Sequence, residues 1–365
     1  MSGVTKHIYE SYIRDINTMW NKQLKKIESV LPRAYNEDDI IKLLKNYYPH
    51  EWKSVEYKKQ YYDIKDKCLI KKFGKARYRM KSAEDILRKT KQFKYLLSDK
   101  TRKNYSDSFD EDICKQNQER LWEARKSKIA RIDQKIANAQ AKTQMVTPKF
   151  VDKLMGLYER KNTSQKDKVY IINELKKYYN SKVINFFFKL NDTEVNRQLR
   201  ECAFYHLQSF NYHPRLRKQK YMQIHTKNKK RKDYLKKVYP YETYSIPYNP
   251  DELEYRIQNG KEQKIKSYDY FISHSSKDSK LVQDIITYEN SIGKNIFCDW
   301  INDSDYLKRN LLCEATLKVI EWRLQQSEAI IFLKTSNSIE SVWCKYELNY
   351  FSELGKPIYY LMKIR

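Results

Sequence analysis

Trp343 and Glu347 are the two residues whose types and spacing most clearly suggest chemistry, because an aromatic ring and a carboxylate stand four positions apart. On a helix this spacing places both side chains on one face. A carboxylate in such a position can stabilise positive charge that develops on a ligand, and the ring can stack on a flat ligand. The alternative is structural: the tryptophan packs against a sheet and the glutamate is a solvated helix residue. We take the pair as the best candidate site in the chain.

The elements around this pair predict where it lies. Residues 328–335 have the continuous apolar core of a buried parallel strand. Thr335 to Ser338 then supply turn and N-cap residues, so that a helix carrying Trp343 and Glu347 should follow directly. The pair should therefore lie at the carboxyl edge of a sheet, where open α/β folds bind ligands.

The last hundred residues alternate short strands and helices. We predict strands at 268–273, 295–300, 328–335 and 357–361, with helices at 279–290 and 314–326 between them. This order is typical of a parallel, doubly wound α/β sheet.

Four pieces of this region, in this order, resemble a TIR (Toll/interleukin-1 receptor) domain over residues 267–365. They are the opening strand and loop Tyr268–Ser275 with Asp278, the second strand Phe297–Trp300, the third strand, and the helix with Trp343-Cys344-x-x-Glu347-Leu348. The resemblance implies a flavodoxin-like parallel sheet. Two departures are that the loop after the second strand lacks a Pro-Gly turn and that the last helix and strand are expected to be short or missing.

In enzymatic members of the family the helix glutamate is the catalytic residue for NAD⁺ cleavage, which the resemblance transfers to Glu347. The aromatic residue four positions earlier lines the nicotinamide-ribose pocket, which corresponds to Trp343. Further substrate-binding candidates are Phe271, Ser273, His274 and Trp300. NAD⁺ is then the substrate, with no bound cofactor and no metal expected. The implied role is that of a bacterial antiphage effector whose TIR domains associate with one another.

The chemistry agrees with a single carboxylate. Breaking the nicotinamide–ribose bond expels a neutral pyridine, so that no general acid is needed, and positive charge at the sugar carbon must be stabilised. Ordinary glycosidases need two carboxyl groups because their leaving group takes a proton. The prediction is an NAD⁺ glycohydrolase. The alternatives are a non-enzymatic TIR scaffold and, less well supported, a receiver-like phosphoacceptor at Asp299.

The positive charge of the chain is confined to its first part. Residues 267–365 carry 12 Lys and Arg against 13 Asp and Glu, whereas the preceding 266 residues carry 61 against 33. Such an asymmetry favours a polyanion-facing region. Codon bias towards lysine is the alternative, and a defence-system partner protein is a third kind of contact.

The apolar periodicity before residue 267 is helical nearly throughout. We predict helices at 6–30, 37–48, 51–71, 83–97, 111–142, 148–159, 165–179, 182–190 and 193–209. Residues 168–210 faintly resemble a HEAT-type repeat without a clear second copy. The resulting division is a basic helical recognition and assembly region (1–224), a basic linker with Pro and Tyr (225–266), and the TIR-like domain.

The most basic segment follows residue 213. Its nucleic-acid-binding candidates are Arg215, Arg217, Lys229, Lys230, Arg231 and Lys232, with His213 among the interleaved rings that could stack on bases. A solvated charge run is the alternative. Six cysteines without a C-x-x-C spacing favour a reduced, cytoplasmic setting, and no apolar run is long enough for a membrane span.

Overall fold

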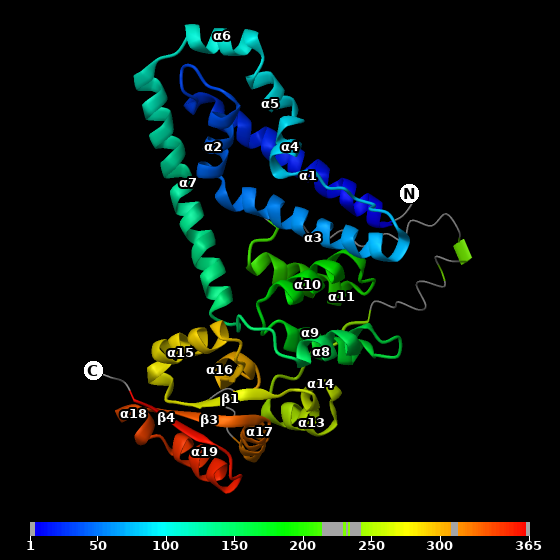
Figure 1. The fold of residues 1–365 in the computed structure, drawn as a ribbon, viewed down its shortest axis with the longest axis vertical. Coiled ribbons are helices and arrows are strands. Elements are labelled where there is room, and N and C mark those ends of the chain that lie inside the picture. The colour runs from blue at the N-terminus through cyan, green and yellow to red at the C-terminus, as the bar shows by residue number, and fades with distance from the viewer. Residues whose placement is uncertain (1–3, 214–228, 231–232, 234–241, 308–312, 363–365) are drawn as a thin grey trace. The chain divides into compact units, whose positions relative to one another are not determined.

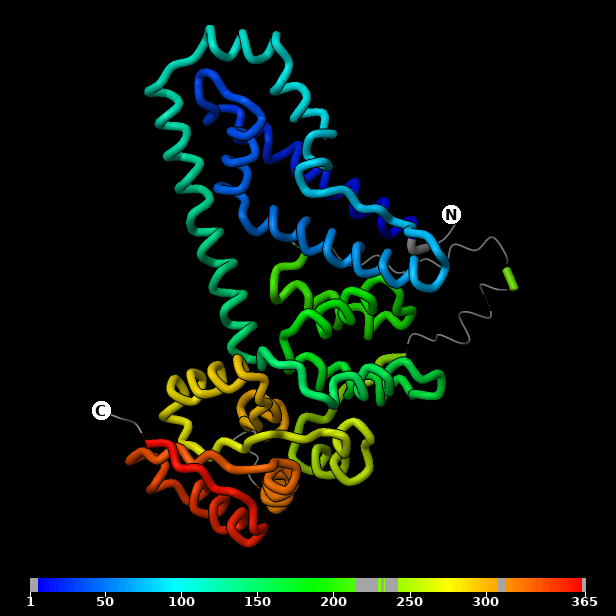
Figure 2. The backbone as a smooth tube through the Cα atoms, in the orientation of Figure 1, coloured from blue at the N-terminus to red at the C-terminus, as the bar shows by residue number. Residues whose placement is uncertain are grey.

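The computed structural model describes residues 4–213, 229–230, 233, 242–307 and 313–362. Two compact units divide the chain. The first comprises residues 1–137, 191–195 and 203–238, and the second comprises residues 138–190, 196–202 and 239–365. The sheet and the helical segment 138–190 therefore belong to the same unit (Figures 1 and 2).

The first unit is helical in its described residues. Its elements are α1 (Val4–Ile27), η1 (Glu28–Val30), α2 (Glu37–Tyr47), α3 (Pro49–Phe73), α4 (Ala83–Arg88), α5 (Lys91–Leu96), α6 (Asp99–Asp107) and α7 (Glu111–Gln140) up to residue 137. Trp20 of α1 and Trp52 of α3 meet in its core, with ring centroids 5.7 Å apart. The N-cap of α2 is a full capping box between Asn36 and Asp39.

The second unit combines helices with a parallel sheet. Helices α10 (Ser181–Thr193) and α11 (Arg197–Ser209) contribute residues to both units. The other elements of the second unit are α8 (Phe150–Glu159), α9 (Gln165–Leu175), α13 (Pro250–Asn259), α14 (Lys261–Lys264), β1 (Tyr268–Ser273), η2 (Ser276–Asp278), α15 (Ser279–Ser291), β2 (Ile296–Phe297), α16 (Asp299–Asn302), α17 (Glu314–Gln325), β3 (Ser327–Lys334), α18 (Ser336–Ile339), α19 (Val342–Glu353) and β4 (Ile358–Met362).

All four strands are parallel, in the order β2-β1-β3-β4. One face carries an apolar cluster that joins Phe271 and Ile330 to Leu324 of α17 and Phe351 of α19. The opposite face packs Ile272 against α15. Helices thus cover both faces, which confirms the predicted parallel α/β sheet beside a mainly helical region.

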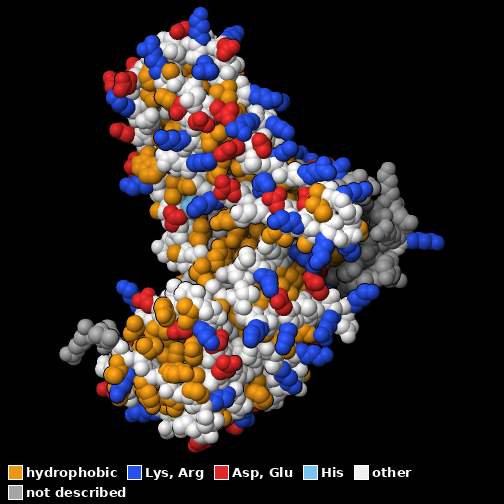
Figure 3. All heavy atoms as spheres, viewed as in Figure 1, with side chains coloured by type: hydrophobic (Ala, Val, Ile, Leu, Met, Phe, Trp, Pro, Cys, Tyr) orange, Lys and Arg blue, Asp and Glu red, His pale blue; other side chains and the backbone are white. Residues whose placement is uncertain are grey.

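The two edges of the sheet differ. The backbone of β2 is paired with the side chain of Gln144, whose amide accepts from the Ile296 N–H at 3.1 Å and donates to the Ile296 carbonyl. At the other edge, β4 exposes apolar side chains, and Figure 3 shows hydrophobic side chains gathered over this part of the sheet. They are Tyr359, Tyr360, Leu361 and Met362.

Several predicted elements need correction. The second strand is only Ile296–Phe297, because Asp299 to Asn302 turn into the short helix α16. The predicted helix 83–97 is two helices, since Thr90 ends one and caps the next by accepting from the Phe93 N–H. Helices α6 and α13 were not predicted.

Candidate active site

The site lies where the strand order reverses. From β1 the chain moves outward to β2 and then crosses back to β3 on the other side, so that the carboxyl ends of β1 and β3 flank a switch point. Ser273 ends β1, and Thr335 follows β3. Asp278 joins the two loops by accepting hydrogen bonds from the Thr335 hydroxyl at 2.6 Å and from the Asn337 amide at 3.0 Å.

Glu347 enters this edge of the sheet from α19. The helix begins where Ser341 accepts a hydrogen bond from the Cys344 N–H. One turn later Glu347 accepts a hydrogen bond of 2.6 Å from the hydroxyl of Ser273, a buried residue. Sequence reasoning placed Glu347 near this edge, and the structure brings it onto the last residue of β1.

The carboxyl group of Glu347 has an unusual pKa. Burial raises that pKa to about 8, the Ser273 hydrogen bond opposes the rise, and repulsion from Asp299 adds to it. A group with this pKa changes its protonation state close to neutral pH, and carboxyl groups with strongly perturbed pKa values are candidates for function. Glu347 is partly buried when the whole residue is considered, and its carboxyl group is the buried part.

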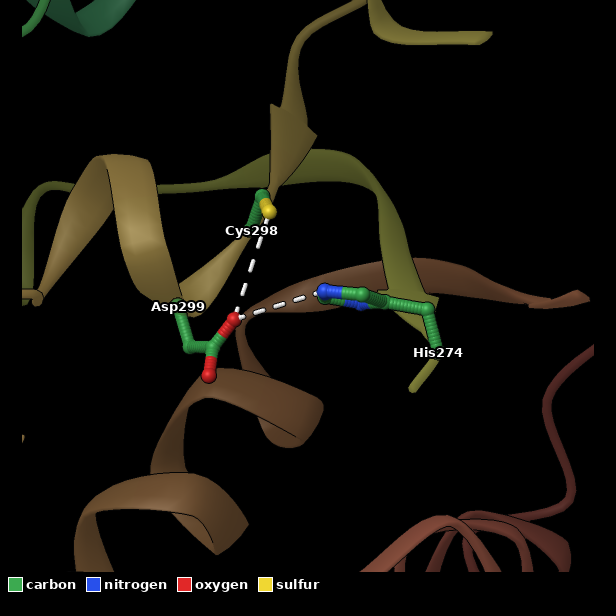
Figure 4. Close-up of side chains that lie close together, drawn as sticks. All are labelled: His274, Cys298 and Asp299. Atoms are coloured by element: carbon green, nitrogen blue, oxygen red, sulfur yellow. Dashed lines mark hydrogen bonds and ion pairs between the residues drawn. The ribbon is translucent and has the colours of Figure 1, made fainter. Parts of the chain in front are cut away.

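Asp299 begins α16 just beyond β2 and faces the same site. Its carboxylate is 4.0 Å from the thiol of Cys298 and 3.8 Å from Nε2 of His274 (Figure 4). The Asp299 side chain is 56 % exposed, whereas Cys298 is fully buried, and burial raises the thiol pKa well above its usual value. The site thus contains two carboxylates of different exposure.

His274 and Trp300 form a hydrogen-bonded pair. The indole N–H of Trp300 donates to Nε2 of His274 at 3.0 Å, and Nδ1 lies 3.0 Å from the carbonyl of Ile272. Since a carbonyl can only accept, Nδ1 carries the ring proton and Nε2 is the acceptor. Both residues were predicted for the site, and the structure places them beside Asp299.

His274, Cys298 and Asp299 have potential metal-ligand atoms within 4.8 Å of one another. The arrangement does not suit a metal ion, because the lone pair on Nε2 is engaged by Trp300 and the buried thiol favours its protonated form. We therefore assign this cluster to shaping the site around Asp299.

Phe271 and Trp343 belong to the apolar packing on one face of the sheet. Phe271 is buried in the sheet core and stacks on Phe297 at 5.0 Å between ring centroids. Trp343 is partly buried and packs against the same cluster. Substrate contact by either ring stays a prediction, and the packing gives both a structural role.

The sequence predicted Asp299 only as the phosphoacceptor of a receiver-like alternative and Asp278 only as part of the TIR-like opening loop, so that neither was among the predicted substrate-binding residues. Of the six nucleic-acid-binding candidates, the structure describes two. Lys229 and Lys230 are exposed, whereas Arg215, Arg217, Arg231 and Lys232 lie outside the described residues. His213 is not available to stack on bases, because it is buried between Phe204 and Tyr12 with centroid distances of 5.2 and 6.1 Å.

A parallel sheet in this order, with a helix glutamate hydrogen-bonded to the end of the first strand, agrees with the TIR-type domain that the sequence resembles. The chain is 36 % identical over 359 residues to the putative cyclic ADP-D-ribose synthase TIR2 of Cytobacillus dafuensis, covering 98 % of this chain and 92 % of the relative. It therefore belongs to the same family of bacterial TIR-domain proteins as TIR2.

A shorter relative covers only part of the chain. The probable 3′ cyclic ADP-D-ribose synthase ThsB′ of Bacillus cereus (strain MSX-D12) is 30 % identical over 95 residues, which are 26 % of this chain and 49 % of the relative. No family model and no solved structure matches the chain. Among the residues that the structure describes, no helix is long and apolar enough to span a membrane.

Proposed function

We propose that the chain cleaves the nicotinamide–ribose bond of NAD⁺ and that Glu347 is the catalytic residue. The observation that carries the proposal is the environment of the Glu347 carboxyl group. This group accepts a hydrogen bond from Ser273 at the switch point of the sheet, and its pKa is raised to about 8. The names of TIR2 and ThsB′, as cyclic ADP-D-ribose synthases, support NAD⁺ as the substrate.

In this mechanism the Glu347 carboxyl group is ionised in the transition state. The bond between the sugar carbon and the nicotinamide nitrogen breaks, its electron pair leaves with nicotinamide, and the sugar carbon becomes positively charged. The Glu347 carboxylate stabilises this charge, and Ser273 holds it in place. The cationic nicotinamide ring of a bound NAD⁺ lowers the pKa of Glu347, because an opposite charge favours the ionised form.

The second half of the reaction decides the product. If a hydroxyl group of the same ADP-ribose attacks the sugar carbon, a cyclic ADP-ribose forms, and if water attacks, ADP-ribose is released. In either case the attacking oxygen loses a proton, which the Asp299 or Glu347 carboxylate can accept. The names of the relatives favour the cyclic product, whereas the sequence predicted an NAD⁺ hydrolase and left open whether the product is cyclised. We propose cyclisation with hydrolysis as a competing outcome.

The proposed biological role is defence against phage, with TIR domains associating when the basic helical region is engaged. The alternative is a non-enzymatic scaffold in which Trp343 and Glu347 form a homotypic contact. Purified full-length protein incubated with NAD⁺ distinguishes these functions when nicotinamide, linear ADP-ribose and cyclic ADP-ribose are separated by chromatography and identified by mass. Nicotinamide release above the rate of a Glu347→Gln variant supports the enzyme. Absence of release at every protein concentration, with and without nucleic acid, would favour the scaffold.

A further inference from the structure

The segment 298–303 carries two residues of the candidate site, Asp299 and Trp300, on a helix of only four residues. One helical turn has almost no intrinsic stability, because nucleation fixes several backbone angles for few hydrogen bonds. Its position must therefore be set by contacts from outside. The structure supplies these contacts from the helical segment 138–190 of the same unit and from Arg323 of α17.

Gln144 makes the first set of contacts. Its side chain is completely buried, and besides pairing with the backbone of Ile296 it donates to Oδ1 of Asn302 at 3.3 Å. The same Asn302 oxygen accepts from the Cys298 N–H at 2.9 Å. Gln144 also accepts from the Asn290 side chain at 3.2 Å. A single side chain thus holds both ends of the turn that contains Asp299.

Lys177 makes the second set through Asp303, the residue after α16. Asp303 is completely buried, 3.6 Å from the Lys177 ammonium, and accepts from Arg323 at 2.7 Å. Lys177 also pairs with Glu174 at 2.9 Å, and Glu174 accepts from Lys266 at 2.8 Å. The surrounding cations keep the pKa of Asp303 and Glu174 below their usual values despite burial.

The two sets of contacts come from two backbone segments that are hydrogen-bonded to each other, one around Gln144 and one around Lys177. The Gln144 N–H donates to the Lys177 carbonyl at 2.9 Å, and the Gln144 carbonyl accepts from the Tyr179 N–H at 2.9 Å. Gln144 and Lys177 are therefore fixed relative to each other by the backbone before either reaches the segment 298–303. A displacement of these two paired segments would move both ends of α16 together.

We infer that Gln144 and Lys177 are positioning residues for NAD⁺ cleavage, because together they fix the segment 298–303 and thereby place Asp299 beside His274 in the candidate site. The inference rests on the proposed function for its catalytic consequence, but the contacts themselves can be tested without it. It makes the helical segment 138–190 part of the catalytic module, so that residues 267–365 alone lack two of the groups that shape their own site.

The test uses the full chain with two variants, Gln144→Ala and Lys177→Met, each beside a matched neighbour. Thr143→Ala removes an adjacent buried hydroxyl that donates a hydrogen bond within its own segment, to the Gln140 carbonyl at 2.8 Å. Lys176→Met removes the adjacent ammonium, which forms no ion pair among the described residues. Gln144→Glu keeps the shape and the acceptor but loses the donor. Circular dichroism and thermal melting confirm that each variant is folded at the assay temperature.

Two measurements are made on every variant. Hydrogen–deuterium exchange of the peptide covering 296–303 should accelerate in Gln144→Ala, Gln144→Glu and Lys177→Met, and stay at the wild-type rate in both neighbours. In the NAD⁺ assay, kcat should fall on the order of 10-fold in the three test variants while KM changes less, because a displaced site group weakens the transition state more than substrate binding.

The outcomes separate the inference from the proposed function. If wild-type protein cleaves no NAD⁺, the function fails, and the exchange measurement still decides whether Gln144 and Lys177 hold the segment. Wild-type exchange at 296–303 in all three folded test variants would overturn the inference. Accelerated exchange with an unchanged kcat would also overturn it, since the segment would then be loosened without consequence for catalysis. If Gln144→Ala fails to fold, Gln144→Glu and Lys177→Met provide the same comparison.

Discussion

The hydroxyl of Ser273 donates a hydrogen bond of 2.6 Å to the carboxylate of Glu347. The last residue of the first strand is thereby joined to the middle of α19, two segments 74 residues apart. The bond fixes the orientation of the carboxylate and favours its ionised form, against a burial that favours the neutral form. This balance gives the site its expected behaviour towards mutation and pH.

Replacing Glu347 by glutamine keeps the shape of the side chain but removes its charge. We expect Glu347→Gln to lower kcat for NAD⁺ cleavage on the order of 10²-fold or more with the fold retained, since the developing positive charge loses its stabilising carboxylate. Glu353→Gln, at an exposed position of the same helix, is the matched control. A Glu347→Gln variant with more than half the wild-type rate would exclude Glu347 from the mechanism.

The activity should depend on pH through the ionisation of Glu347. The pKa of the free carboxyl group is raised to about 8, so that the reactive ionised form increases as the pH rises through this value. We therefore expect kcat/KM to rise with pH and level off above about 8. The groups that surround this carboxyl group are the Ser273 hydroxyl, the Asp299 carboxylate and the thiols of Cys298 and Cys344.

Two substitutions should move the pH profile in opposite directions. Asp299→Asn removes a negative charge that raises the pKa of Glu347, so that the midpoint should shift to lower pH. Ser273→Ala removes the hydrogen bond that lowers this pKa, so that the midpoint should shift to higher pH. Profiles of kcat/KM between pH 5 and 10 check both directions. Coincident midpoints in the three proteins would mean that another group controls the pH dependence.

The raised pKa also affects stability. Between the usual carboxyl pKa and about 8, the folded protein binds more protons at Glu347 than the unfolded chain does, so that this group makes the free energy of unfolding fall as the pH rises. Glu347→Gln removes this contribution. The melting temperature should therefore change more unfavourably from pH 5 to pH 8 in the wild type than in the variant. The same change in both proteins would contradict the raised pKa of Glu347.

Much of the sheet could be predicted because its signals are local. The apolar run at 328–335 corresponds to β3, whereas the cap residues after it begin the short helix α18, and α19 begins only after its own cap, Ser341. The extension of the second strand through Trp300 was wrong because Asn302 and the Trp300–His274 pair favour a turn there, which depends on residues distant in sequence. The apolar pattern of Phe297 to Trp300 is compatible with either structure.

The contribution of the helical segment to the site could not be predicted. Gln144 is an ordinary polar residue near a helix end, and its role as partner of an edge strand 152 residues away has no local signal. The buried charges of Glu174 and Lys177 follow at a helical spacing that usually indicates a solvated face. Their burial depends on Asp303 and Arg323, which only the folded chain brings near.

Trp343→Ala tests whether the ring contributes to substrate use beyond its packing. The ring packs against the sheet cluster that contains Phe271, so truncation should cost up to about 3 to 5 kcal/mol of unfolding free energy. If the ring also contacts nicotinamide, KM for NAD⁺ should rise in the folded variant. Thermal melting and NAD⁺ kinetics are measured together with a control variant, Val342→Ala, because residue Val342 is 78 % exposed. A destabilised but kinetically normal variant would leave Trp343 with a packing role alone.

The charge asymmetry predicts salt-dependent binding of nucleic acid by the full chain. Each duplex phosphate neutralised should contribute about 0.9 log units of affinity per log unit of salt, or nearer 0.7 on a single strand. Reversing the exposed Lys229 and Lys230 to glutamate should reduce this slope, because phosphate contacts carry the salt dependence. Reversing the exposed Lys280 and Lys345 in the near-neutral TIR domain changes the net charge equally and should leave the slope unchanged.

Fluorescence anisotropy with labelled duplex and single-stranded oligonucleotides at several salt concentrations measures both slopes. Equal slopes in the two variants would remove Lys229 and Lys230 from the interface, and no binding by the wild type at low salt would direct the search for the basic region's partner to acidic proteins.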